Sequence, residues 1–295
     1  SAGPAGVGGT PSGPDAPCGR TGGGTGAGAV GSAGPAALRA GAAPAPAGRP
    51  VLRARALRVA YDGFTALDGV DLDLPPGRIT AVVGPNGAGK STLFHCLAGT
   101  VRPVSGRVAF GERDITRLPA HARTRLGIAR TFQQLAVFPT LTVAENVRVG
   151  AEQGRIKNKN KNTDTDVDAD VDADADAAER ALRLLGLDRD VRSRAAAGLP
   201  TGTLRRVELA RALAGGPRVL LLDEPAAGLD TGEVTALARV LRALAADGTA
   251  LLVVEHDLDL VAGLADTVHV MAAGRIVATG PAGHVLEGLG TAADR

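Results

Sequence analysis

Apolar and polar positions alternate in some parts of the chain and form unbroken apolar runs in others, and this difference predicts its secondary structure. Residues 57–61 and 70–74 alternate between apolar and polar or small side chains, which is typical of strands with one buried face. Residues 79–83, 219–222 and 250–254 are apolar throughout, as expected for strands that are buried on both faces of a sheet.

The segments between these runs favour helices. We expect helices at residues 90–97, about 203–214 and 231–246, the first of them ending near Gly99. Asp230 and Glu233 have the spacing of a capping box at the start of the last helix. Strands that alternate with helices predict an α/β core around a mainly parallel sheet.

Two segments have a composition that does not suit a packed core. Residues 1–50 are nearly all Ala, Gly, Pro and Ser, and we expect a disordered tail before a folded domain over residues 51–290. Residues 155–177 contain alternating Lys and Asn, followed by Asp at every second position. This run lacks the glycine and the glutamate of a calcium-binding loop, so we interpret it as an exposed low-complexity insertion.

Charge and cysteine content limit the kinds of partner and of cellular compartment to be expected. The formal net charge is +2, which gives no reason to expect a nucleic-acid partner. The two cysteines, Cys18 and Cys96, do not form a disulfide framework pattern, and a reducing cytosolic setting fits best. No apolar run approaches the roughly 18 to 20 residues that cross a bilayer, and no signal peptide is predicted. Any membrane role would therefore require a membrane-spanning partner.

The strongest chemical motif follows the apolar run at residues 79–83 and precedes a predicted helix. It matches the phosphate-loop pattern G-x-x-x-x-G-K-[ST] at every fixed position. Glycines allow backbone N–H groups to surround phosphate, and the helix N-terminus favours an anion. The lysine would neutralise the β- and γ-phosphates and the serine would bind Mg²⁺. We expect a nucleoside triphosphate, which the family resemblance given below identifies as ATP, to contact Gly84, Pro85, Asn86, Gly87, Ala88, Gly89, Lys90, Ser91 and Thr92.

A second motif places two carboxylates at the end of a buried strand. Asp223 and Glu224 directly follow the apolar run 219–222. Ligands of open α/β sheets bind at this end of the strands. Asp223 is predicted to hold Mg²⁺ and Glu224 to polarise the attacking water. Together, the two motifs predict a nucleotide triphosphatase.

With these motifs in place, residues 51–286 resemble the ABC ATPase family. The resemblance implies that Tyr61 stacks on adenine, that Gln133 contacts Mg²⁺ or the attacking water, and that residues 227–230 cross a dimer interface. It also implies that His256 contacts the γ-phosphate; the other histidines match no motif and are expected to be structural. The implied fold is α/β: a P-loop NTPase core of the ABC ATPase type, an antiparallel β subdomain and a small helical subdomain at about 140–215.

The segments 127–133, 138–139, 141–147 and 222–229 are similar to the ATPases of branched-chain amino acid importers, particularly the LivG type. This resemblance implies an ATPase at the cytoplasmic face of the cell membrane, importing branched-chain amino acids or related amides. Its expected partners are transmembrane permease subunits, a second ABC ATPase and, indirectly, an extracytoplasmic solute-binding protein. The alternative is a soluble ABC ATPase with no transport role, such as a cofactor-assembly component.

The family signature is altered in this chain. The segment at residues 199–203, named here the signature segment, has Pro200 where the family has Ser and Thr203 where it has Gln. In the family, this segment contacts the γ-phosphate that the opposite subunit holds, and proline offers neither a hydroxyl nor an N–H. The change favours a heterodimer with a different ATPase over a homodimer, because a homodimer would carry the altered contact twice.

Overall fold

The structure is a computed structural model that describes residues 49–131, 136–159 and 167–293. The chain divides into two units, Ser1–Ala43 and Pro44–Arg295, and the first unit lies outside the described residues. The same holds for nearly all of the predicted tail at 1–50 and for Gln133. Within the described residues, no helix combines the length and apolar character needed to cross a membrane.

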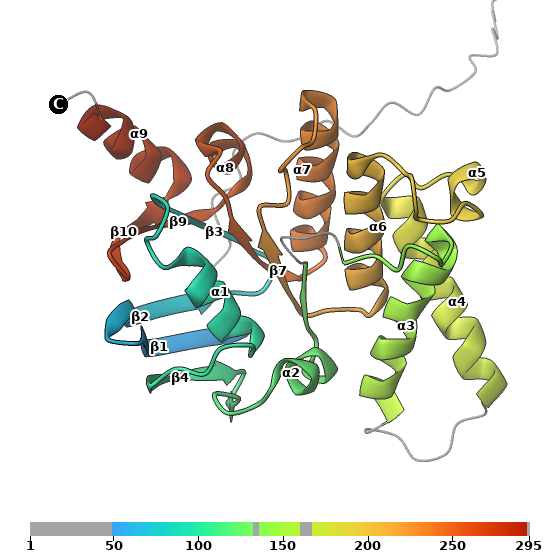
Figure 1. The fold of residues 1–295 in the computed structure, drawn as a ribbon, viewed down its shortest axis with the longest axis horizontal. Coiled ribbons are helices and arrows are strands. Elements are labelled where there is room, and N and C mark those ends of the chain that lie inside the picture. Colours follow the sequence, from blue (N-terminus) through green and yellow to red (C-terminus); the bar gives the residue numbers. More distant parts are fainter. Residues whose placement is uncertain (1–48, 132–135, 160–166, 294–295) are drawn as a thin grey trace, which may run out of the picture. The chain divides into compact units, whose positions relative to one another are not determined.

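The central sheet has six strands in the order β10-β9-β3-β8-β7-β6 (Figure 1). Neighbours from β9 to β6 are parallel, while β10 joins the edge in the antiparallel sense. All residues of β3, β7 and β8 are buried, which confirms the strands predicted from unbroken apolar runs. The strands are β3 (Ile79–Val83), β6 (Ile128–Arg130), β7 (Val219–Asp223), β8 (Ala250–Val254), β9 (Thr267–Ala272) and β10 (Arg275–Pro281).

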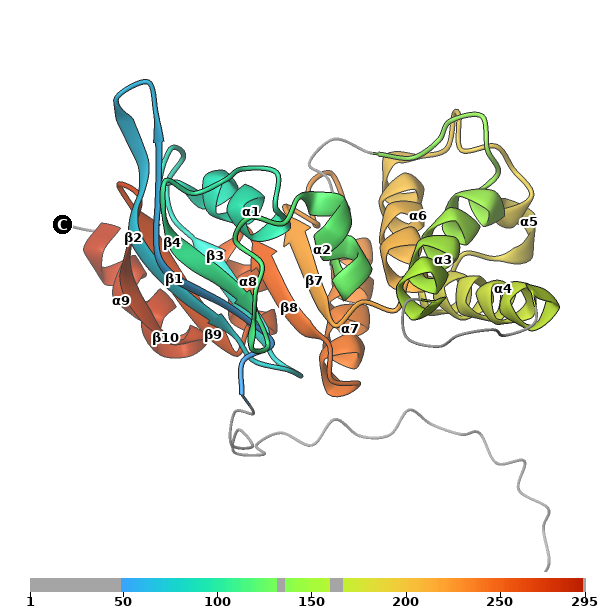
Figure 2. The same cartoon turned by 90° about the horizontal axis from the view of Figure 1, so that it is seen from below.

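A second, antiparallel sheet has the order β2-β1-β4-β5. Its strands are β1 (Leu52–Tyr61), β2 (Phe64–Leu74), β4 (Ser105–Phe110) and β5 (Arg113–Asp114). Asp62 and Gly63 join β1 to β2, and both have positive φ, as a tight two-residue hairpin turn requires. The hairpin projects beyond the rest of its sheet (Figure 2). The strands predicted from alternation and the antiparallel subdomain are thus confirmed.

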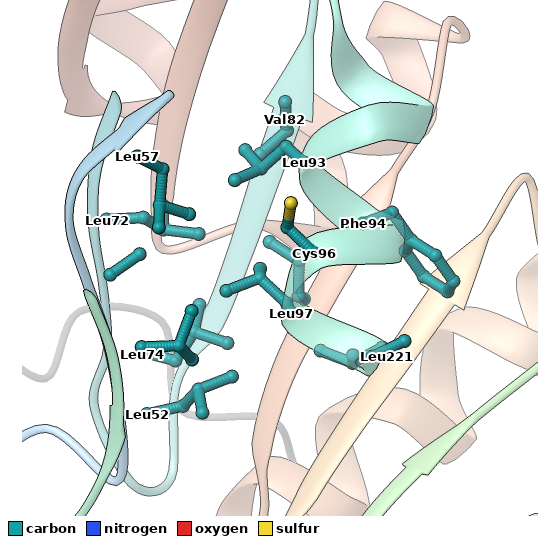
Figure 3. Close-up of a cluster of buried hydrophobic side chains, with 14 of the residues drawn as sticks. Leu52, Leu57, Leu72, Leu74, Val82, Leu93, Phe94, Cys96, Leu97 and Leu221 are labelled. Atoms are coloured by element: carbon teal, nitrogen blue, oxygen red, sulfur yellow. The ribbon is translucent and has the colours of Figure 1, made fainter. Parts of the chain in front are cut away.

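Helix α1 (Lys90–Ala98) lies between the two sheets. Its apolar residues Leu93, Cys96 and Leu97 pack among leucines of β1 and β2 and against Val82 of β3 (Figure 3). The opposite face of the central sheet packs against α7 (Thr231–Ala246) and α8 (Leu258–Leu264). As predicted, α1 ends at Gly99 and α7 begins with a capping box. Two further helices are α2 (Ala120–Leu126) and α9 (Ala282–Ala293).

Four helices form a group beside the sheets (Figures 1 and 2): α3 (Val143–Lys159), α4 (Val167–Leu184), α5 (Arg189–Arg192) and α6 (Thr201–Ala214). Helix α6 begins two residues earlier than expected, because Pro200 occupies its N-cap position. Helices α3 and α4 also extend into the predicted insertion at 155–177, whose residues 160–166 lie outside the described ranges.

The insertion is not exposed at every described position. Asp174 is buried on the same side of α4 as Ala178 and Ala181. A residue type that recurs every second position spreads around a helix of 3.6 residues per turn, and of the three aspartates of the series whose burial is described, one falls on the packed face. The prediction of an exposed segment is therefore wrong at Asp174, while Asp172 and Asp176 are exposed.

Candidate active site

Three adjacent strands, β3, β8 and β7, bring the predicted site residues to one edge of the central sheet. The pairing register aligns Val82, Val254 and Asp223 across these strands. The Glu224 N–H donates to the carbonyl of Val254 (2.9 Å), and the Glu255 N–H donates to the carbonyl of Val82 (3.3 Å). The segments that follow the three strands therefore begin side by side, at the carboxyl ends where ligands of α/β sheets bind.

Close backbone contacts fix the phosphate loop between β3 and α1. Gly84 and Gly89 have positive φ, and a Cβ at these positions would lie 2.2 Å from the Met271 carbonyl oxygen and 2.5 Å from that of Ala66. Gly87 also has positive φ, but a Cβ there would meet no atom within 4 Å. The loop thus packs against the backbone of Met271 and Ala66 at its two ends, while the space beside Gly87 is open.

The groups around this loop suit a bound phosphate. Gly89 is the N-cap of α1 and provides no side-chain cap, and the first N–H groups of a helix have no acceptor within it. The Lys90 ammonium donates to the carbonyls of Gly84 (2.7 Å) and Pro85 (2.9 Å), so its positive charge lies at the loop. Ser91 follows in the first turn and is exposed. Backbone donors, a helix dipole and a cation therefore fit the phosphates of ATP.

Asp223 and Glu224 form an acidic pair next to the loop. Asp223 is only 4% exposed, and burial, followed by the Glu224 carboxylate, raises the pKa of its carboxyl above the ordinary range. Lys90 is among the cations that lower this pKa. Two neighbouring carboxylates are oxygen donors of the kind that Mg²⁺ prefers, and Ser91 in the first turn of α1 adds a hydroxyl. The residues present therefore fit this ion.

Glu224 has a backbone conformation that is uncommon for its residue type. Its φ is 45°, in the left-handed region, and such strain is often found at functional sites. The His256 Nδ1 lies 3.9 Å from the Glu224 Oε1, and the side chains of these residues are 67% and 33% exposed, respectively. The structure thus brings together the predicted water-polarising carboxylate and the predicted γ-phosphate contact.

Of the two further predicted contacts, the structure describes Tyr61 but not Gln133. Tyr61 is 46% exposed at the tip of the β1–β2 hairpin, paired with the exposed Phe64. Residue Ala66 of β2 lies directly against Gly89, so the hairpin adjoins the phosphate loop. Gln133 is outside the described residues, but Thr131, two positions earlier, accepts a hydrogen bond from the Asp223 N–H (3.3 Å).

Sequence reasoning missed three residues that shape the site. The Gly274 N–H donates to the Ala88 carbonyl (3.0 Å), so the turn between β9 and β10 supports the phosphate loop. His95, expected to be purely structural, is close enough to lower the pKa of Asp223. Glu255 is buried between the segments that follow β7 and β8. Of these, only the helical spacing of Ser91 and His95, four residues apart, was a usable signal.

The signature segment lies at the start of α6. Pro200 is its N-cap and makes no side-chain capping bond. Gly202 is buried against the carboxylate of Glu233, because a Cβ at Gly202 would lie 2.2 Å from the Glu233 Oε1. The N-terminus of α6 therefore already has a carboxylate beside it.

Comparisons with known proteins agree with this geometry. The family described as ABC transporter matches residues 67–227. The chain is 42% identical over 233 residues to the ribose import ATP-binding protein RbsA 3 of Rubrobacter xylanophilus, covering 79% of this chain but 45% of that protein. It is 35% identical over 236 residues to the high-affinity branched-chain amino acid transport ATP-binding protein LivG of Escherichia coli K12, covering 79% and 92%, respectively.

A solved structure has the same fold. The nucleotide-free ATP-binding cassette of an ABC transporter superposes with a TM-score of 0.70 at 30% identity, covering 81% of this chain and 94% of that one. A second cassette, solved in its ADP conformation, has a TM-score of 0.70 at 31% identity and covers 81% and 96%. The chain belongs to the ABC transporter family and is an ATPase of the ATP-binding cassette type. The predicted family and fold class are thus confirmed.

Proposed function

We propose that this chain binds ATP with Mg²⁺ and hydrolyses it to energise an importer for branched-chain amino acids or related amides. The observation that carries the proposal is the convergence of the phosphate loop, Asp223, Glu224 and His256 at the ends of three adjacent strands. Their backbone positions are fixed by the sheet, as catalytic groups require.

In this proposal, the phosphate loop binds the triphosphate through its backbone N–H groups, and Lys90 places positive charge beside it. Ser91, Asp223 and Gln133 would hold Mg²⁺, which would neutralise charge on the phosphates. Glu224 polarises the attacking water, and His256, at the neighbouring position, contacts the γ-phosphate. Tyr61 supplies an exposed ring for stacking on adenine.

The choice of substrate class rests on the relatives. One is named for ribose import and another for branched-chain amino acid transport. The chain covers 92% of the LivG relative but 45% of the RbsA relative, and this supports the amino-acid class. Because one is named for import and the other for transport, they favour a transporter subunit over the soluble alternative.

The proposed partners are two transmembrane permease subunits, a second ABC ATPase and, indirectly, a solute-binding protein, with the chain at the cytoplasmic face of the membrane. A groove of about 550 Å³ between α2, α3 and α6 supports a docking position for the permease. The exposed ring of Phe138, five residues after Gln133 in the sequence, lines this groove, and the Arg211 guanidinium lies 5.5 Å from the ring centroid. Contact here would reach Gln133 through a short stretch of chain.

Hydrolysis is tested with two substitutions. We expect Glu224→Gln to retain ATP binding and to lower kcat by about 10²- to 10⁴-fold, because the amide cannot act as a base. Lys90→Ala should instead weaken ATP binding by about ten- to a hundredfold through loss of a charged contact. Nucleotide-binding and phosphate-release assays measure the two effects separately, and undiminished turnover by Glu224→Gln would remove Glu224 from its proposed role.

The transport assignment is tested by co-expression with permease partners. We expect ATP-dependent uptake of leucine into vesicles that contain the complex, and no uptake with the Glu224→Gln chain. Uptake of ribose and not leucine would reassign the substrate class while leaving the ATPase proposal intact. Failure of the purified chain to associate with any permease pair would favour the soluble alternative.

A further inference from the structure

Glu255, the first residue after β8, connects the segments that follow two strands of the site. Its side chain is 1% exposed. The Oε1 accepts a hydrogen bond from the Ala226 N–H (3.1 Å), in the turn after Glu224, and the Oε2 accepts one from the His256 N–H (3.2 Å). One carboxylate therefore joins the turn after β7 to the loop after β8.

The same residue is also tied to a third strand and faces the histidine ring. Its N–H donates to the Val82 carbonyl of β3 (3.3 Å), next to the phosphate loop. The His256 Nδ1 lies 3.8 Å from the Glu255 Oε2 and 3.9 Å from the Glu224 Oε1. The imidazole is thus close to two carboxylates, of which one is anchored to backbone N–H groups.

Burying a carboxylate at this place is unfavourable, and its hydrogen bonds offset part of that desolvation. Burial raises the pKa of the Glu255 carboxyl, and the hydrogen bonds from backbone N–H groups lower it. An apolar residue would avoid the desolvation, but it would leave the N–H groups of Ala226 and His256 without this acceptor. The arrangement is therefore specific to a side chain with two acceptor oxygens of suitable reach.

We propose that Glu255 is a positioning residue for ATP hydrolysis, holding the turn after Glu224 and the loop at His256 in one fixed arrangement. The φ of 45° at Glu224 requires support from surrounding contacts, and the bond to Ala226 supplies part of it. The inference rests on the proposed function, because the relative position of Glu224 and His256 matters for catalysis only if both residues act in ATP hydrolysis.

The test compares Glu255→Gln and Glu255→Ala with a matched control, Asp266→Asn. The Asp266 carboxylate accepts from the Ile79 N–H (2.8 Å) at the start of β3, the end of that strand opposite the phosphate loop. We expect Glu255→Gln to lower kcat about tenfold and Glu255→Ala about a hundredfold, with KM for ATP changed less than about twofold. Asp266→Asn should leave both constants unchanged even where it lowers the melting temperature.

A second readout needs no nucleotide. Amide hydrogen exchange of the purified chain should be at least about tenfold faster at Ala226 and His256 in Glu255→Gln than in the wild type, while exchange in β3 is unchanged. Wild-type kcat in a folded Glu255→Gln chain, or unchanged exchange at both amides, overturns the inference. If Glu255→Ala does not fold, Glu255→Gln decides.

The two proposals fail in different ways. A wild-type chain that hydrolyses no ATP contradicts the proposed function, and the exchange experiment still determines whether Glu255 joins the two segments. Turnover that depends on Glu224 but not on Glu255 contradicts only the positioning role.

Discussion

The phosphate loop and the signature segment both end at a helix N-terminus, but they are built for different surroundings. At α1, the N-cap is Gly89, without a side chain, and the space beside Gly87 is open. At α6, the N-cap is Pro200, and Gly202 lies against the Glu233 carboxylate. A helix N-terminus attracts anions. The first is thus open to a phosphate, whereas the second already has an acid beside it.

The capping box of α7 holds this acid in place. The Glu233 N–H donates to the Asp230 Oδ1 (2.8 Å), and the Glu233 Oε2 accepts from the Asp230 N–H (3.3 Å). Asp230 ends the segment that the family resemblance places across a dimer interface. The same glutamate therefore caps α7 and lies beside α6, so a change at the signature segment also affects the segment at residues 227–230.

The largest effect should come from a substitution that introduces a backbone clash in the phosphate loop. In Gly84→Ala the new Cβ would lie 2.2 Å from a backbone oxygen, which cannot move aside easily. We expect stability to fall by about 3 kcal/mol and ATP affinity to fall at least about a hundredfold. Calorimetric titration with ATP and urea unfolding measure these two quantities.

Gly87→Ala is the matched control, because its φ is also positive but the new Cβ meets no neighbour within 4 Å. It should cost only the backbone strain, about 1 kcal/mol, and reduce ATP affinity less than about tenfold. Equal losses at the two positions would mean that contact with Met271 does not shape the loop.

An intermediate effect is expected at the signature segment. Pro200→Ser restores a hydroxyl at the N-cap of α6, where a hydrogen bond to a charged group contributes about 1.5–3 kcal/mol. The ATPase rate of a homodimer should therefore rise about ten- to a hundredfold. In a mixed pair with a second ATPase that has an intact signature, one composite site is already complete, and the gain should be smaller.

Pro281→Ser is the control for this substitution, because Pro281 also directly precedes a helix, α9, and is exposed. It should leave the ATPase rate unchanged. A homodimer that is fully active with Pro200, and that is unaffected by Pro200→Ser, would show that backbone groups alone make the signature contact.

The comparison of the phosphate loop with the signature segment also shows which features the sequence could predict. The phosphate loop and the buried strands were predictable because their chemistry lies in consecutive residues and in unbroken apolar runs. Short strands such as β5 and β6 were not, since two or three residues contain no period. The contacts of Met271, Glu233 and Glu255 were also not predictable, because each joins segments far apart in the chain.

The predicted insertion is a case in which composition alone gave a wrong prediction. Its composition indicated exposure, yet α4 turns one aspartate of the series, Asp174, into a buried residue. Composition averages over faces, while a helix assigns each residue to one side. Which side of a helix faces the core depends on tertiary packing, and so does the position of each site residue.

The smallest effect should come from removing the negative charge of Glu233 beside the N-terminus of α6. Glu233→Gln keeps an oxygen that can accept from the Asp230 N–H but removes the negative charge next to Gly202. A charge at a helix N-terminus contributes about 0.3–1 kcal/mol. If this charge opposes the γ-phosphate of a partner's ATP, its loss should raise the ATPase rate about two- to fivefold at limiting ATP.

Glu145→Gln is the control for this last comparison, because Glu145 makes a similar capping arrangement with Thr142 at the start of α3. Glu233→Gln should lower the free energy of unfolding by about 0.5 kcal/mol. Glu145→Gln should lower it as well, but only Glu233→Gln should change the dependence of the rate on ATP concentration. A rate that rises equally in both variants would assign the effect to general loosening of the helices. A fall in rate with Glu233→Gln alone would mean that the carboxylate assists the α6 N-terminus, and its charge would then not oppose the phosphate of a partner's ATP.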